Sequence, residues 1–146
     1  MAKRRKNAGK GHVEAPTSSC LLICDDVLVS TGKNKHFLEG VIGAVGVASV
    51  PAVVGPYVAY IRLSNVYGGQ EIVLSICNAT DDEEVFRVMA TSSEKSDPLE
   101  THTIILAIPP FEIRETGRYI FSASHGGVPF AQSMITIVVP EQKELS

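Results

Sequence analysis

Short runs of β-branched and aromatic residues recur along the chain, and turn-forming residues separate them. Within a run the apolar and polar positions alternate with a period of two, as in a strand with one buried face. No segment carries an apolar stripe of period 3.6 over a helical length. The predicted strands are residues 20–29, 37–47, 57–65, 70–77, 85–91, 101–108, 118–125 and 128–139. This pattern predicts an all-β, antiparallel sandwich of seven to eight strands, of the Ig-like or jelly-roll-like Greek-key type.

The sharpest turn signal is the pair Gly126-Gly127 between two predicted strands. A two-residue type I′ turn needs a positive φ at both central positions, which glycine adopts without strain. After this turn the apolar positions change phase by one between Phe130 and Ile135. A β-bulge near residues 131–133 is expected to absorb that change.

A second structural motif precedes the same hairpin. Gly117 followed by Tyr119 at the start of a strand is typical of a tyrosine corner, in which the phenol hydrogen-bonds back to the backbone of a crossing connection. We therefore expect a structural role, not a catalytic one, for both residues.

Length and charge divide the chain into a short arm and one domain. The 146 residues fit a single domain, predicted at residues 19–140, with an arm at 1–18 and a flexible tail at 141–146. The formal net charge is −3, from 13 basic and 16 acidic residues. Residues 1–12 hold 5 of the basic residues and none of the acids, so the remainder has 8 basic against 16 acidic residues, or −8.

The arm has no apolar periodicity and is predicted to be disordered. Its cations are Lys3, Arg4, Arg5, Lys6 and Lys10. Such a run can neutralise the phosphates of nucleic acid or of anionic lipid, or it can serve as a targeting signal that a receptor recognises. A tail that only increases solubility explains the run equally well. Because the arm holds no aromatic residue, any nucleic-acid contact would be non-specific and salt-sensitive.

Neither secretion nor a membrane span is predicted. Residues 40–61 carry no charge, but two prolines five residues apart and four glycines would break a spanning helix. The apolar run after the arm is too short for a signal peptide.

Cys20 and Cys24 would lie about 13 Å apart on one strand face, too far for a disulfide. Reduced thiols at these positions and at Cys77 predict a cytoplasmic protein.

The polar residues of the sequence do not form a recognisable motif for a catalytic or metal site. Asp25 and Asp26 are neighbours on a strand and point to opposite faces, so a structural role is favoured, with one of them on the core side unless a bulge intervenes. The acidic run 81–84 lacks the spacing of a calcium loop and is interpreted as a solvated turn. No histidine has a ligand or nucleophile at motif spacing. We expect no enzyme activity, no metal and no cofactor.

Several short motifs resemble a bacterial domain-of-unknown-function family of small, cytosolic β-sandwich proteins. The motifs are Cys24-Asp25-Asp26-Val27, Gly32-Lys33, Gly40-Val41-Ile42, Pro51, the strand at 57–63 and Gly117-Arg118-Tyr119-Ile120-Phe121. The resemblance covers residues 20–140 and implies a sandwich fold, without catalytic residues to carry over. The glycine-rich stretch after residue 40 and the basic arm depart from that family's pattern.

Together these features favour a non-enzymatic binding or assembly module that acts through protein contacts. The predicted surfaces are an exposed edge strand and the uncharged connection 48–56, with Val50, Val53 and Val54 as contact residues. The alternative is a capsid-like structural protein that binds nucleic acid through its arm. A sugar-binding sandwich or an enzyme is a third possibility, but the chain has no Trp to form a stacking platform.

Overall fold

The computed structural model describes residues 16–30, 35–65, 69–91 and 101–140. These residues form eleven strands and no helix. The strands are β1 (Thr17–Val29), β2 (His36–Val41), β3 (Ala44–Gly46), β4 (Ala52–Val54), β5 (Tyr57–Ser64), β6 (Glu71–Asn78), β7 (Glu84–Thr91), β8 (His102–Ile108), β9 (Phe111–Ile113), β10 (Gly117–His125) and β11 (Val128–Val138). Every predicted strand is present, the stretch 37–47 is divided into β2 and β3, and the three-residue strands β4 and β9 were not predicted. β1 begins at Thr17, inside the segment 1–18 that the sequence assigned to the arm.

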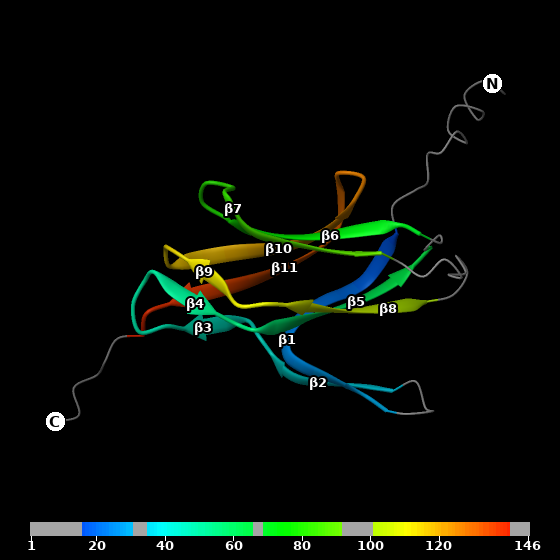
Figure 1. Cartoon of the computed structure of the whole chain (residues 1–146), viewed down its shortest axis with the longest axis horizontal. Helices are drawn as coiled ribbons and strands as arrows, with labels where there is room; N and C mark the ends of the chain where they lie inside the picture. The colour runs from blue at the N-terminus through cyan, green and yellow to red at the C-terminus, as the bar shows by residue number, and fades with distance from the viewer. Residues whose placement is uncertain (1–15, 31–34, 66–68, 92–100, 141–146) are drawn as a thin grey trace, which may run out of the picture.

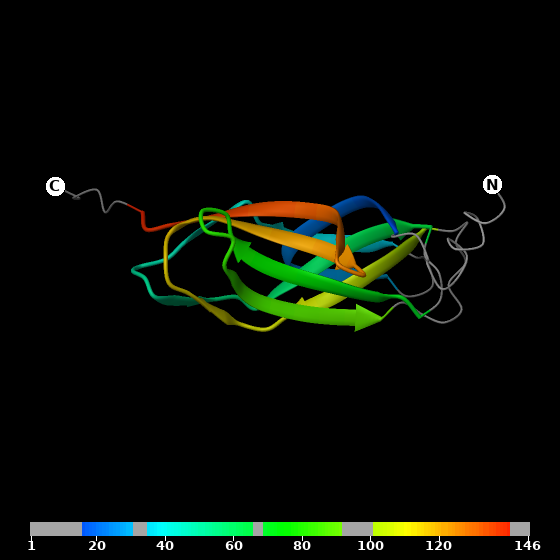
Figure 2. The same cartoon turned by 90° about the horizontal axis from the view of Figure 1, so that it is seen from above.

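Two sheets form the sandwich, and the predicted all-β fold is confirmed. The four-stranded sheet has the order β2-β1-β5-β8, and the five-stranded sheet has the order β3-β11-β10-β6-β7. Figure 1 shows β6, β7 and β10 above β5 and β8, with the small β4–β9 sheet at one end of the molecule. The view in Figure 2 shows the edge strands β7 and β8 along one side, whereas β1 and β11 meet along the other.

The prediction of a purely antiparallel sandwich needs one correction. β3 pairs with β11 in parallel, with Ala44 opposite Thr136. The chain leaves the first sheet after Val41 and enters the second at Ala44. Two backbone bonds mark the crossing: Ile42 N–H donates to the carbonyl of Ile23 on β1, and Thr136 N–H donates to the carbonyl of Gly43. The stretch 37–47 was predicted as one strand because its apolar composition does not reveal this change of sheet.

The core lies between the two sheets and follows the predicted period of two. Along β6 the buried residues are Ile72, Leu74 and Ile76, and along β10 they are Tyr119, Phe121 and Ala123. Phe111 on the unpredicted strand β9 closes one end of the core. Its ring stacks on Phe86 at 5.5 Å between centroids and meets Tyr57 and Phe121 edge to face. The short β4–β9 sheet therefore places a large aromatic side chain, Phe111, in the core.

The β10–β11 hairpin forms as predicted. His125 and Val128 pair across the turn, and Gly126 and Gly127 have φ values of 58° and 81°. The bulge lies nearer the turn than residues 131–133, because Ala123 pairs with Ala131 whereas Ser124 pairs with Pro129. The extra residue is thus Phe130. Pro129 has no N–H to donate to the ladder, and prolines within sheets are commonly found at such bulges.

The tyrosine corner is also confirmed. The Tyr119 hydroxyl donates a hydrogen bond of 2.6 Å to the carbonyl oxygen of Glu115, four residues upstream. The Tyr119 side chain is buried, and Gly117 has a φ of 128°. This bond ties the β9–β10 connection to the start of β10.

β1 bends sharply near Cys24 and divides into two halves. Its first half pairs with β5 as far as Cys24, and its second half pairs with β2 from Cys24 to Val29. Figure 1 shows the second half running back beneath β5 together with β2. Tyr60 points away from the core on β5 yet is only 5% exposed. His36 on β2 lies against it, with a 2.8 Å hydrogen bond between Nδ1 and the hydroxyl and an edge-to-face ring contact. Residues 25–29 and β2 thus form a hairpin, called here the folded-back hairpin, that covers part of the outer sheet face.

Candidate functional site

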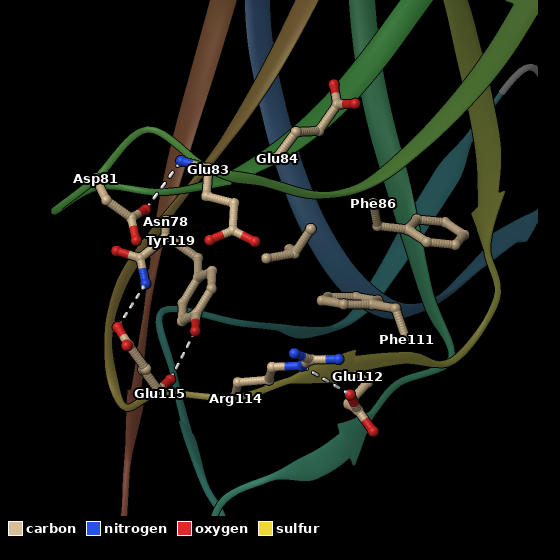
Figure 3. A pocket seen from close by; sticks show the side chains of 11 residues that line it. Asn78, Asp81, Glu83, Glu84, Phe86, Phe111, Glu112, Arg114, Glu115 and Tyr119 are labelled. Atoms are coloured by element: carbon tan, nitrogen blue, oxygen red, sulfur yellow. Dashed lines mark hydrogen bonds and ion pairs between the residues drawn. The ribbon is translucent and has the colours of Figure 1, made fainter.

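An acidic hollow of about 650 Å³ opens at the end of the sandwich that β9 closes. The turn between β6 and β7 forms one wall, and β9 with the β9–β10 connection forms the other (Figure 3). Its lining residues are Asn78, Asp81, Glu83, Glu84, Val85, Phe86, Phe111, Glu112, Arg114, Glu115 and Tyr119. Five of these are acidic and one is basic, so the hollow attracts cations and repels phosphate groups.

Local hydrogen bonds build the β6–β7 turn from the acidic run 81–84. Asp81 Oδ1 accepts the N–H of Glu83 at 2.9 Å, and Asn78 Oδ1 accepts the N–H of Thr80 at 2.8 Å. Asp82 has a φ of 58°, a conformation that Asp tolerates better than most side chains. All four acidic side chains are exposed. The predicted solvated turn is therefore confirmed.

The other polar groups of the hollow bond to one another. Arg114 Nε donates to Glu112 Oε1 at 3.3 Å, and Asn78 Nδ2 donates to Glu115 Oε2 at 3.4 Å. Figure 3 shows the Phe86 and Phe111 rings facing each other on one side and Glu83 directed toward Tyr119. Across residues 16–30, 35–65, 69–91 and 101–140, no three His, Cys, Asp or Glu side chains are grouped to hold a metal. The hollow is electrostatically suited to a cationic group but holds no nucleophile paired with a base.

The folded-back hairpin forms a second surface, which is apolar and which the sequence did not reveal. Leu28 and Phe37 pair directly across its two strands and are 51% and 55% exposed. Residues that pair directly point to the same side, so their side chains lie next to each other. The next pair on this side is Asp26 opposite Glu39, both exposed. The hairpin thus presents an apolar pair beside an acidic pair.

One family model matches the chain from residue 19 to residue 138, and its family is described as a family of unknown function, DUF6941. The chain belongs to the DUF6941 family. The match spans the whole sandwich, which confirms the expected membership of a family of unknown function. No curated protein matches the sequence.

In this DUF6941 member both aspartates of the first strand are exposed, so the core-side position expected for one of them in a regular strand does not occur. The reason is the bend in β1, since residues beyond Cys24 leave the core and enter the folded-back hairpin. Asp26 Oδ1 accepts the N–H of Val27 at 2.8 Å. The Asp25 carboxylate lies over the Cα of Gly40, whose φ is 66°. The structural role favoured for this pair agrees with its position at the bend.

The three predicted contact residues of the connection 48–56 differ in their exposure to solvent. Val53 is 67% exposed, but Val54 is buried and Val50 is half-buried against the core. The three-residue strand β4 explains this, because alternate residues of a strand point to opposite sides. The prediction of Val54 as a contact residue is wrong. Lys3, Arg4, Arg5, Lys6 and Lys10 lie outside the described residues.

Cys20, Cys24 and Cys77 form no disulfide with one another. Burial raises the pKa of the Cys24 thiol above its ordinary value of 9.0, and the nearby Asp25 adds to that rise. Burial likewise raises the pKa of Cys77. A raised pKa disfavours the thiolate, so neither thiol is activated as a nucleophile. In the part of the chain that the structure describes, no helix has the length and hydropathy to cross a bilayer.

Proposed function

We propose that this protein is a non-enzymatic binding or assembly module that acts through protein–protein contacts in the cytoplasm. The observation that carries the proposal is the apolar pair Leu28 and Phe37, each more than half exposed and in register on the folded-back hairpin. Single exposed apolar side chains are ordinary, whereas adjacent large ones favour a contact surface. Three cysteines that form no disulfide with one another are typical of proteins in a reducing compartment.

The charge next to this pair specifies the partner's chemistry. Asp26 and Glu39 face each other directly, and like charges at such a position repel. A basic side chain placed between them would relieve the repulsion. The partner is therefore a protein surface that carries apolar side chains next to a Lys or Arg.

The hairpin's attachment makes this surface preformed. His36 and Tyr60 hold it against the sheet, and the backbone bond from Ile42 to Ile23 continues the attachment where β2 ends. A preformed surface binds with less loss of conformational entropy than a loop that must become ordered.

Photo-crosslinking in the cells that produce the protein tests the proposal. A photo-reactive amino acid replaces Phe37 in one full-length variant and Met134 in the control. Met134 is 50% exposed and lies on β11 of the other sheet, so both positions offer similar access. We expect a discrete protein adduct at position 37 that Glu39→Lys suppresses, and none at position 134. The same adducts at both positions, or none at position 37, would refute the proposal.

A second candidate rests on the five cations among the first 12 residues. A capsid-like structural role would use this arm for non-specific phosphate binding, which falls steeply as salt rises. Deleting residues 1–12 should then abolish retention of mixed-sequence nucleic acid at low salt. Equal retention by the full-length and shortened chains would eliminate this candidate.

A further inference from the structure

The two main sheets end in four edge strands, and three of them carry features that discourage pairing with another chain. β2 contains Glu39 and Gly40, the latter with a φ of 66°. β3 has only three residues. β7 carries Glu84 and Arg87 and has a register shift against β6 near its start. Charge, strand bends and short length are the usual protections of a sheet edge.

β8 is the fourth edge strand and has none of these protections. It pairs with β5 over seven consecutive positions without a register shift. Residues 103–108 contain no charge, no Gly and no Pro. Ile105, at its centre, is 40% exposed. Within the described residues no strand pairs with the side of β8 that faces away from β5, so residues 103–108 present their outer N–H and C=O groups at the sheet edge.

We propose that β8 pairs with β8 of a second copy of this chain, antiparallel and about a two-fold axis at Ile105. This inference rests on the proposed function as an assembly module and names the partner at one further surface. The two four-stranded sheets would then join into one continuous sheet. In this register Ile105 faces its own copy, Ile104 faces Leu106, and Thr103 faces Ala107.

The β8 edge is a place where two copies of this acidic chain can meet without opposing like charges. Residues 13–146 carry 16 acids against 8 bases, so two copies repel over most of their surfaces. The β8 register opposes only uncharged side chains, and the prolines at 109 and 110 end the strand before any acid is reached. An antiparallel strand pair is also self-complementary, as a two-fold interface requires.

Sedimentation velocity of the purified full-length protein over a wide concentration range tests this pairing. We expect the wild type to shift with concentration from 15.6 kDa toward twice that mass. Ile105→Lys should remain monomeric, because the register opposes two lysines. The matched control is Met89→Lys, which places the same side chain on the outer face of the edge strand β7 and should dimerise like the wild type. An equimolar mixture of Ile105→Lys and Ile105→Glu should regain the dimer.

A wild type that stays monomeric, an Ile105→Lys variant that still dimerises, or a Met89→Lys variant that loses the dimer would each overturn the β8 pairing. A mixture that stays monomeric would overturn the register. Circular dichroism of the variants shows whether they retain the sandwich. The adduct at position 37 reports separately on the hairpin surface, so either proposal can fail while the other stands.

Discussion

Replacing Gly40 by alanine tests how the folded-back hairpin is joined to the sandwich. Gly40 has a φ of 66°, and a Cβ at this position would overlap the carboxylate of Asp25 on the neighbouring strand. Gly43, three residues later, has no positive φ and no atom within 4 Å of an added Cβ. Gly43→Ala is therefore a matched control in the same segment.

Two opposing terms determine the size of the effect. A left-handed conformation costs an L-residue about 1–2 kcal/mol. Gly→Ala also restricts the unfolded chain, which stabilises the folded state by about 0.4–1 kcal/mol. Gly43→Ala gains only the second term. The free energy of unfolding of Gly40→Ala should therefore lie about 1–2 kcal/mol below that of Gly43→Ala, before any cost of moving Asp25.

Urea denaturation measures this difference as a shift of about 0.5–1 M in the midpoint, for a slope near 2 kcal/mol/M. The double variant Asp25→Ala/Gly40→Ala separates the two effects, because truncating the carboxylate removes the closest contacts but leaves the tight 3.1 Å contact with the Cβ of residue 25 and the backbone term. We expect it to recover only part of the lost stability. A Gly40→Ala protein as stable as the Gly43→Ala protein would refute the conformation assigned to Gly40 and the bend that depends on it.

Two further predictions concern groups of the core. Tyr119→Phe removes the hydroxyl that donates to the carbonyl oxygen of Glu115. Glu115 is exposed, so water can hydrogen-bond to its carbonyl in the variant, and no buried acceptor is left unsatisfied. The free energy of unfolding should therefore fall only by the net value of one hydrogen bond, about 1–1.5 kcal/mol, in the same urea assay. An unchanged midpoint would contradict the tyrosine corner. Burial raises the pKa of Cys24 above 9.0 and that of Tyr119 above 10.0 in the folded state. The folded state then holds these protons more tightly than the unfolded state, so this stability is complete below about pH 9 and is lost as the pH rises through the folded pKa values. Urea midpoints that stay constant from neutral to strongly alkaline pH would show that these groups titrate alike in both states.

Features that depend on a few neighbouring residues were predictable from the sequence. The period-two alternation identified every long strand, and Gly126-Gly127 identified the turn because few residues other than glycine accept a positive φ at two successive positions. Gly117 and Tyr119 identified the corner for the same local reason, since the hydrogen bond spans only four residues. The acidic run 81–84 was also interpretable locally, as an exposed turn.

Features that depend on contacts between distant residues were decided by the tertiary structure alone. β4 and β9 are three residues long and pair with each other. Ala52 and its partner Ile113 are 61 positions apart in the sequence (113 − 52), a separation beyond any local pattern. The stretch 37–47 divides between two sheets because β11 offers β3 a parallel partner.

The two candidate surfaces also depend on contacts between residues that are distant in the sequence. The acidic hollow joins residues from 78–86 and 111–119, and the folded-back hairpin exists because His36 reaches Tyr60 after β1 bends. Alternation along a strand indicates which residues share a face, but only the packing of one sheet layer on another determines which face is buried. Leu28 and Phe37 lie in predicted strands, and only the bend of β1 and the packing of the hairpin place both side chains on the surface.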